Sequence, residues 1–130
     1  MQQVLMAKQL PPLRIMVVDD NRDAADLVAE FLVLSGHEAI PVYGGAEALQ
    51  VAETFEPDVV FLDLGMPEVS GFQVASRLRQ ASKFQSTKMI AYTAWSDELT
   101  RAKTRNGGFD HHLVKPATLD DILGLLGPAA

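Results

Sequence analysis

The sequence of 130 residues contains no cysteine, only 7% aromatic residues and no long apolar run. Without cysteine there can be no disulfide framework, no thiolate zinc site and no cysteine nucleophile, which favours a reducing compartment. No stretch reaches the roughly 18 apolar residues that a membrane helix needs, and the first ten residues lack the apolar core of a signal peptide. We therefore expect a cytoplasmic protein that does not associate with membranes.

Basic residues are also scarce, since 11 Lys and Arg face 17 Asp and Glu for a net charge of −6. Nucleic-acid binding needs a basic surface, so we expect no nucleic-acid partner. The charge is uneven, because residues 13–69 hold 12 acidic and 2 basic residues while residues 70–115 hold 3 acidic and 8 basic ones. We interpret the basic side chains as solvated helix surface, with docking of an acidic partner as the alternative. They include Arg77, Arg79, Lys83, Lys88, Arg101, Lys103 and Arg105.

The chain does contain enough apolar residues, 48% of the total, for one hydrophobic core. Its length suits a single domain. We place this domain at residues 13–127, with a tail or linker at 1–12 and a short tail at 128–130. Pro11 and Pro12 support the first boundary because consecutive prolines favour extended backbone over helix.

Short apolar segments alternate with helical patterns along the domain. The patterns predict strands at 13–18, 39–43, 58–63, 88–93 and 111–114, and helices at about 24–34, 46–55, 71–80, 97–105 and 119–126. Right-handed crossovers between such strands produce a parallel sheet with helices on both faces. Pro41 places the second strand at an edge of the sheet. The fold class is therefore α/β, a doubly wound five-stranded parallel sheet with five helices.

Reactive side chains follow these strands. Asp19 and Asp20 come after the first strand, Asp63 ends the third, Thr93 ends the fourth, and Lys115 follows the fifth. In an open parallel sheet ligands bind at this carboxyl edge. Two carboxylates about 4 Å apart repel by roughly 4 kcal/mol at an effective dielectric near 20, so the cluster needs a cation. Oxygen ligands favour Mg²⁺ (or Mn²⁺), and a carboxylate nucleophile beside an ammonium and a hydroxyl suits phosphoryl transfer.

Five short motifs occur in order between Leu13 and Leu126. They are Val17-Val18-Asp19-Asp20-Asn21, Leu62-Asp63-Leu64-Gly65-Met66-Pro67, Gly71-Phe72, Thr93-Ala94 and Val114-Lys115-Pro116. In this order and spacing the chain resembles the receiver domain of two-component response regulators, of the chemotaxis-regulator type. The resemblance implies a flavodoxin-like sheet with strand order 2-1-3-4-5. The segment from Gly108 to Pro116 is similar to receivers attached to hybrid histidine kinases.

The resemblance also implies roles for individual residues. Asp63 would be the phosphoacceptor, with Mg²⁺ held directly by Asp20 and Asp63, by Asp19 largely through water, and by the carbonyl of Gly65. Thr93, the backbone amide of Ala94 and Lys115 would bind the phosphoryl group. Pro67, Gly71 and Pro116 would be structural, with a cis peptide between Lys115 and Pro116.

The partners implied by the resemblance are a sensor histidine kinase or a histidine phosphotransfer domain, whose phosphohistidine supplies the phosphoryl group. Thr93 and His112 would then shift the surface formed by the helix at 97–105, the strand at 111–114 and the last helix. A downstream protein would bind this surface, and a phosphorylation-linked dimer is one form of the response. The domain would perform its own phosphorylation and autodephosphorylation without being a turnover enzyme.

Three residues depart from the commonest family pattern. His112 stands where Tyr or Phe is usual, so the switch differs from the usual one. Gly65, two residues after Asp63, and Trp95, two after Thr93, cannot hold an attacking water, which predicts slow autodephosphorylation. We expect a loop or partner-contact role for Trp95 at least as readily as a core role. His111 and His112 cannot chelate one ion together because successive strand residues point to opposite faces.

Other interpretations remain open for the same residues. The chain can be a constitutive docking module that keeps the fold without being phosphorylated, although it then has no need of the acidic site, the threonine and the lysine. An aspartyl-phosphate phosphatase requires a second Asp where Gly65 stands. A flavin site requires a Ser/Thr-rich phosphate loop after the first strand, where this chain is acidic. The acidic residues before the first helix can also serve only as helix caps.

Overall fold

The computed structural model describes residues 11–127, so the predicted tail at 128–130 and most of that at 1–12 lie outside the described residues. Five strands form one parallel sheet in the order β2-β1-β3-β4-β5. They are β1 (Arg14–Val18), β2 (Glu38–Val42), β3 (Val59–Leu62), β4 (Lys88–Thr93) and β5 (His111–Val114). The predicted fold class and strand order are confirmed, and Pro41 lies on the edge strand β2 as expected.

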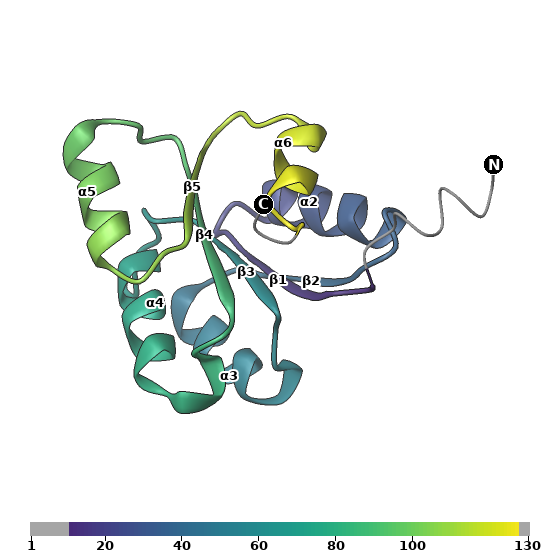
Figure 1. Ribbon diagram of the computed structural model, residues 1–130, viewed down its shortest axis with the longest axis horizontal. Coiled ribbons are helices and arrows are strands. Elements are labelled where there is room, and N and C mark those ends of the chain that lie inside the picture. Colours follow the sequence, from purple (N-terminus) through teal and green to yellow (C-terminus); the bar gives the residue numbers. More distant parts are fainter. Residues whose placement is uncertain (1–10, 128–130) are drawn as a thin grey trace.

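Helices lie on both sides of this sheet (Figure 1). They are α2 (Arg22–Leu34), α3 (Gly45–Phe55), α4 (Gly71–Gln80), α5 (Glu98–Asn106) and α6 (Leu119–Gly124), with a 3₁₀ helix at Ser82–Phe84. Helices α2 and α6 lie on one side, and α3, α4 and α5 on the other. The last helix is shorter than predicted, because the N–H of Leu125 bonds to the carbonyl of Ile122 in a tighter turn. No helix among residues 11–127 is long and apolar enough to cross a membrane.

Two apolar layers hold the helices to the sheet. Alternate residues of each strand point to opposite faces, so the buried central strands contribute to both layers. One layer joins Ile15, Val17, Phe61 and Ile90 to residues of α2 and α6. The other joins Met16, Val18, Leu62 and Met89 to residues of α3 and α4. With apolar residues on both faces, the polar residues are left to the ends of the strands.

Short capping motifs begin the helices directly after the strand ends. The side chain of Asn21 accepts a hydrogen bond from the backbone of Ala24 and so caps the start of α2. Thr118 and Asp121 form a capping box at the start of α6. Gly36, which follows α2, has a φ of 100°, a conformation that glycine adopts without strain. These turns fix the positions at which the polar strand-end residues emerge.

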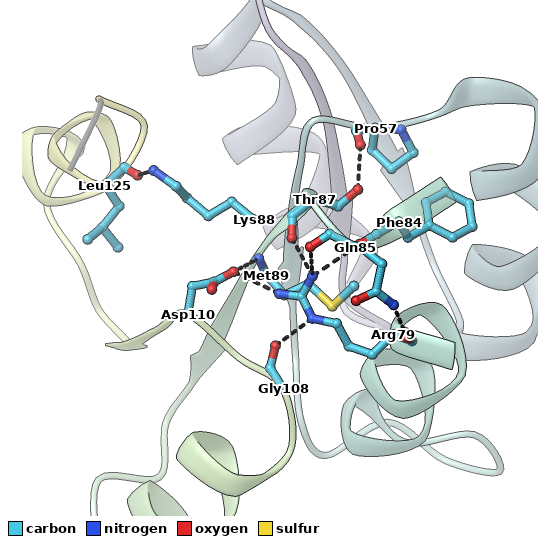
Figure 2. A network of polar contacts seen from close by, with 10 residues as sticks. All are labelled: Pro57, Arg79, Phe84, Gln85, Thr87, Lys88, Met89, Gly108, Asp110 and Leu125. Carbon is cyan, nitrogen blue, oxygen red and sulfur yellow. Dashed lines mark hydrogen bonds and ion pairs between the residues drawn. The ribbon is translucent and has the colours of Figure 1, made fainter. Parts of the chain in front are cut away.

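The position of Arg79 differs from the one predicted from the sequence. We interpreted it as solvated helix surface, but its guanidinium lies in a network beneath the end of α4 (Figure 2). It donates to the carbonyl oxygens of Phe84, Gln85, Thr87 and Gly108 and pairs with Asp110 at 2.8 Å; the remaining bonds span 2.8–3.2 Å. The planar fork of five N–H donors explains why an arginine occupies this place.

Lys88 was also interpreted as a solvated surface residue, and the structure shows otherwise. Its ammonium donates to the backbone carbonyl of Leu125 at 2.8 Å and to that of Gly127 at 3.1 Å. The bonds join the start of β4 to the turn after α6, where carbonyls at the helix end lack intrahelical partners. Both Arg79 and Lys88 thus satisfy backbone acceptors outside their own helix or strand.

Candidate functional site

The carboxyl edge of the sheet brings together the residues that the sequence predicted. Asp19 and Asp20 follow β1, Asp63 follows β3, Thr93 ends β4 and Lys115 follows β5. One carboxylate oxygen from each of the three aspartates lies within 4.8 Å of the others. The arrangement concentrates negative charge at a single point of the sheet edge.

Asp19 is the most buried of these aspartates, with 3% of its surface exposed. One of its oxygens lies 2.7 Å from the ammonium of Lys115, and the other accepts a hydrogen bond of 3.0 Å from the backbone of Asn21. The ammonium of Lys115 also lies 5.0 Å from the centre of the Tyr92 ring. Asp19 therefore holds Lys115 over the site, and Lys115 balances one of the three negative charges.

Asp63 is half-buried, and its environment opposes ionisation. The pKa of Asp63 is raised from an ordinary value of 3.8 to about 6; burial is the largest cause, Lys115 opposes it, and the negative charge of Asp19 adds to it. The backbone N–H of Gly65 faces Asp63 Oδ1 at 3.4 Å. A raised pKa means that the single ammonium of Lys115 does not compensate the cluster fully, so an additional cation would stabilise ionised Asp63.

Gly71 allows α4 to begin directly against the loop that carries Asp63. A Cβ atom at this position would lie 2.3 Å from the carbonyl oxygen of Asp63 and 3.0 Å from the Cα of Leu64. Every other residue type would therefore push the start of the helix away from the site. Pro67 lies exposed in the loop between Asp63 and Gly71. The predicted structural role of Gly71 has a direct physical reason in this contact.

Thr93 and the loop after it lie beside the aspartates. Thr93 is buried, and its hydroxyl accepts a hydrogen bond of 3.2 Å from the backbone of Trp95, while Ala94 between them is exposed. The indole of Trp95 is 49% exposed and lies against Gly65, where a Cβ atom would be 3.1 Å from its Cη2. Trp95 lies in a loop, as expected from the sequence, but its contact with Gly65 was not predicted. The only available signal was that both residues stand two positions after a strand-end site residue.

His112 lies on the side of this loop that faces α5. Its Nε2 is 2.8 Å from the carbonyl oxygen of Trp95, and its Nδ1 is 3.1 Å from the hydroxyl of Thr104. His111 is exposed whereas His112 is partly buried, and His111 and His112 are not among the clustered potential metal ligands. No sequence pattern singled out Thr104 as a partner of His112.

The donor set fits a hard divalent cation. Three carboxylates gather their oxygens at one point, and a half-buried one of them resists ionisation in the absence of further positive charge. Carboxylate, carbonyl and water oxygens are the ligands that Mg²⁺ prefers. The peptide bond between Lys115 and Pro116 is cis, as the sequence resemblance implied.

Comparison with known families decides the classification. The sequence profile of the response regulator receiver domain matches residues 15–126. The chain belongs to this family. Receiver domains typically bind Mg²⁺ at an acidic pocket, and they interact with histidine kinases or phosphotransfer proteins and with downstream targets.

Individual relatives agree with this classification. The chain is 31% identical over 122 residues to the polar-differentiation response regulator DivK of Brucella anthropi, covering 91% of this chain and 99% of that protein. The chemotaxis protein CheY4 of Vibrio cholerae superimposes with a TM-score of 0.85 and 26% identity, over 89% of this chain and 97% of that one. The response regulator TrrA of Thermotoga maritima, solved with Mg²⁺ and beryllium fluoride, gives a TM-score of 0.77 at 32% identity, with coverages of 88% and 96%. Attachment to a hybrid kinase stays a prediction.

Proposed function

We propose that this receiver domain accepts a phosphoryl group on Asp63 from the phosphohistidine of a partner protein. The observation that carries the proposal is the meeting of three carboxylates and Lys115 at one sheet edge, with Asp63 exposed enough to be reached. The transfer forms a bond between an Asp63 oxygen and phosphorus. It breaks the bond between phosphorus and the histidine nitrogen, which keeps the electron pair.

Asp19, Asp20, Asp63 and the carbonyl of Gly65 are the proposed ligands of Mg²⁺. The bound ion would neutralise charge on the phosphoryl oxygens. Since the pKa of Asp63 is raised to about 6, a fraction of its carboxyl groups remains protonated near neutral pH, and a bound cation favours the ionised nucleophile.

The other site residues stabilise and sense the phosphoryl group in this proposal. Lys115 and the backbone amide of Ala94 would donate hydrogen bonds to its oxygens, and the hydroxyl of Thr93 would leave its present partner, the N–H of Trp95, to do the same. Because Asp63 is itself modified, the domain is a phosphoacceptor that loses the group by autodephosphorylation, not a turnover enzyme. We expect this loss to be slow, since Gly65 and Trp95 offer no group that holds water.

The phosphohistidine partner would dock beside this site on an apolar groove of about 450 Å³ between α2 and α6. Exposed leucines line it, namely Leu27, Leu34 and Leu119. The groove lies near the site, because its lining includes Tyr92, whose ring centre is 5.0 Å from the ammonium of Lys115. A partner seated there would have its phosphohistidine close to Asp63.

The response would leave the domain through the surface formed by α5, β5 and α6. His112 of β5 lies partly buried at this surface and contacts both the Trp95 loop and α5. Movement of Thr93 would reach it through Trp95. A downstream protein would bind this surface, and a phosphorylation-linked dimer is an alternative use of it.

Intact mass spectrometry with Mg²⁺ and acetyl phosphate tests the proposal. We expect one added phosphoryl group in the natural protein, and none in Asp63→Asn or when the metal is withheld. If acetyl phosphate and a phosphorylated histidine phosphotransfer domain both fail to modify the protein, the proposal is wrong and the constitutive docking module is favoured.

A further inference from the structure

Trp95 is held at three separate points. Its backbone N–H donates to the hydroxyl of Thr93 at 3.2 Å, and its backbone carbonyl oxygen lies 2.8 Å from His112 Nε2. Its indole lies against Gly65, and the nearest atoms are Cη2, Cζ2 and Cζ3, all carbons of the six-membered ring. The backbone of Trp95 is therefore held by Thr93 and His112, and its half-exposed indole lies against Gly65.

His112 is suited to this task by its two ring nitrogens. A carbonyl oxygen can only accept, so His112 Nε2 must carry a proton and donate to Trp95. The other nitrogen, Nδ1, is 3.1 Å from the hydroxyl of Thr104 in α5, which itself lies 2.9 Å from the carbonyl of Arg101. The ring thus joins the Trp95 loop to α5, and a phenyl ring in its place would form neither bond.

The position of the indole has a consequence for Asp63. The backbone N–H of Gly65 faces Asp63 Oδ1 at 3.4 Å. The indole of Trp95 lies against the α-carbon of the same glycine. Aromatic carbon atoms, which offer no hydrogen bond to a water molecule, therefore lie beside the residue whose N–H faces Asp63.

We infer that His112 is a positioning residue that holds the indole of Trp95 against Gly65 and so slows hydrolysis of phosphorylated Asp63. This inference rests on the proposed function. In the hydrolysis a water oxygen forms a bond to phosphorus, and the bond from phosphorus to the Asp63 oxygen breaks. The electron pair returns to the carboxylate and the water proton passes to solvent. Trp95 acts by restricting the approach of water.

Four variants separate this role from a merely structural one. His112→Phe removes both hydrogen bonds, whereas His112→Gln offers an N–H near the place of Nε2 and His112→Asn a polar group near that of Nδ1. Trp95→Ala removes the indole that lies against Gly65. We expect the Phe, Asn and Ala variants to lose the phosphoryl group about fivefold faster than the natural protein, the equivalent of one lost hydrogen bond, and the Gln variant to stay within about twofold. Intact mass followed after removal of the phosphodonor gives these rates.

A second measurement needs no phosphorylation. Trp95 is the sole tryptophan of the chain, so acrylamide quenching of its fluorescence reports its exposure directly. In the unphosphorylated protein we expect stronger quenching in His112→Phe and His112→Asn, with the natural value kept in His112→Gln. A role of His112 through Thr104 alone would produce the opposite order, with Asn rescuing and Gln failing.

The two measurements distinguish the inference from the function on which it rests. Equal quenching in all the His112 variants overturns the positioning role, whatever the phosphorylation results show. Altered quenching together with unchanged phosphoryl lifetimes overturns the effect on hydrolysis. If the natural protein accepts no phosphoryl group while quenching changes as expected, the proposed function fails and the hold of His112 on Trp95 is supported.

Discussion

Lys115 Nζ lies 2.7 Å from Asp19 Oδ2, which joins the ends of β5 and β1 across the width of the site. The side chain of Asp19 is 4% exposed and that of Lys115 26%, so solvent screens the pair only weakly. The same ammonium lowers the pKa of Asp63 against the larger effect of burial. One lysine therefore compensates a buried carboxylate and eases ionisation of the proposed nucleophile.

Replacing this lysine tests how much of the site's stability depends on it. Lys115→Met leaves the buried carboxylate of Asp19 without its ionic partner, so we expect the free energy of unfolding to fall by roughly 2 to 3 kcal/mol without metal. Mg²⁺ supplies positive charge at the same cluster and should recover more stability in the variant than in the natural protein. Urea denaturation with and without Mg²⁺ measures both effects.

Lys88→Met is the matched control for this comparison. It also removes an ammonium that makes two hydrogen bonds, but its acceptors are the carbonyls of Leu125 and Gly127, away from the aspartates. Its loss of stability should not respond to Mg²⁺. An equal response of Lys88→Met and Lys115→Met would contradict the assignment of Lys115 to the charge balance of the site.

Asp63→Asn should raise the melting temperature near pH 8 by a few degrees. Because the folded pKa, about 6, exceeds the ordinary value of 3.8, the unfolded chain ionises first, and the stability that protonated Asp63 contributes is lost as the pH rises through 6. Asparagine does not ionise and avoids this loss. The gain should shrink near pH 4, where the aspartate is mostly protonated in the folded protein. Thermal unfolding at the two pH values without divalent cations measures the difference.

Glu30→Gln serves as the control for the pH effect, since it removes one negative charge from an exposed position on α2. We expect its melting temperature to follow that of the natural protein at both pH values. If Asp63→Asn gave the same gain near pH 4 as near pH 8, burial of an ionisable carboxylate would not be the cause.

The sheet and the strand-end residues could be predicted because each depends on a local pattern. Apolar runs followed by polar residues locate the strands, and parallel topology brings their ends together without any long-range information. Asp19, Asp63 and Lys115 were found in this way. The network of Arg79 was not, because its backbone acceptors come from segments whose path the pattern does not specify. Arg79 stands four residues after the buried Ala75 and eight after the buried Gly71, and this helical spacing was the available signal that it faces inward.

The contacts of Trp95 were missed for a related reason. The sequence shows a tryptophan after a strand end, but the direction of its side chain depends on a loop held by Thr93 and His112. Backbone hydrogen bonds in such loops are specific to the folded chain and have no periodic signature. The end of α6 at Gly124 was likewise missed, because the apolar spacing of the following leucines continues through a tighter turn.

Arg79→Lys should destabilise the fold by about 2 kcal/mol, because an ammonium cannot reach the same set of acceptors as the planar guanidinium. The four carbonyl oxygens that Arg79 contacts and the carboxylate of Asp110 would compete for three N–H groups (Figure 2). Denaturant unfolding measures the cost. Arg77→Lys, at an exposed position of the same helix, is the control and should change stability by less than about 0.5 kcal/mol. Equal costs for the two substitutions would contradict a structural role specific to Arg79.

Leu27→Asp should weaken phosphotransfer from a partner without affecting the chemistry at Asp63. Leu27 is 69% exposed and lines the apolar groove between α2 and α6, so an added charge there opposes docking while costing the fold little. We expect the rate of transfer from a phosphorylated histidine phosphotransfer domain to fall about tenfold at subsaturating partner concentration, as loss of an interface anchor does. The rate of labelling by acetyl phosphate, which needs no docking surface, should stay the same.

Val33→Asp is the control for the groove, because Val33 is 51% exposed on the same helix but does not line the groove. It introduces the same charge into α2 at a similar exposure, so it reports any general effect of an added negative charge on this helix. We expect both of its rates to match those of the natural protein. A loss of phosphotransfer in Val33→Asp equal to that in Leu27→Asp would locate docking on the whole outer face of α2 and not in the groove, and unchanged transfer in both would place the partner elsewhere.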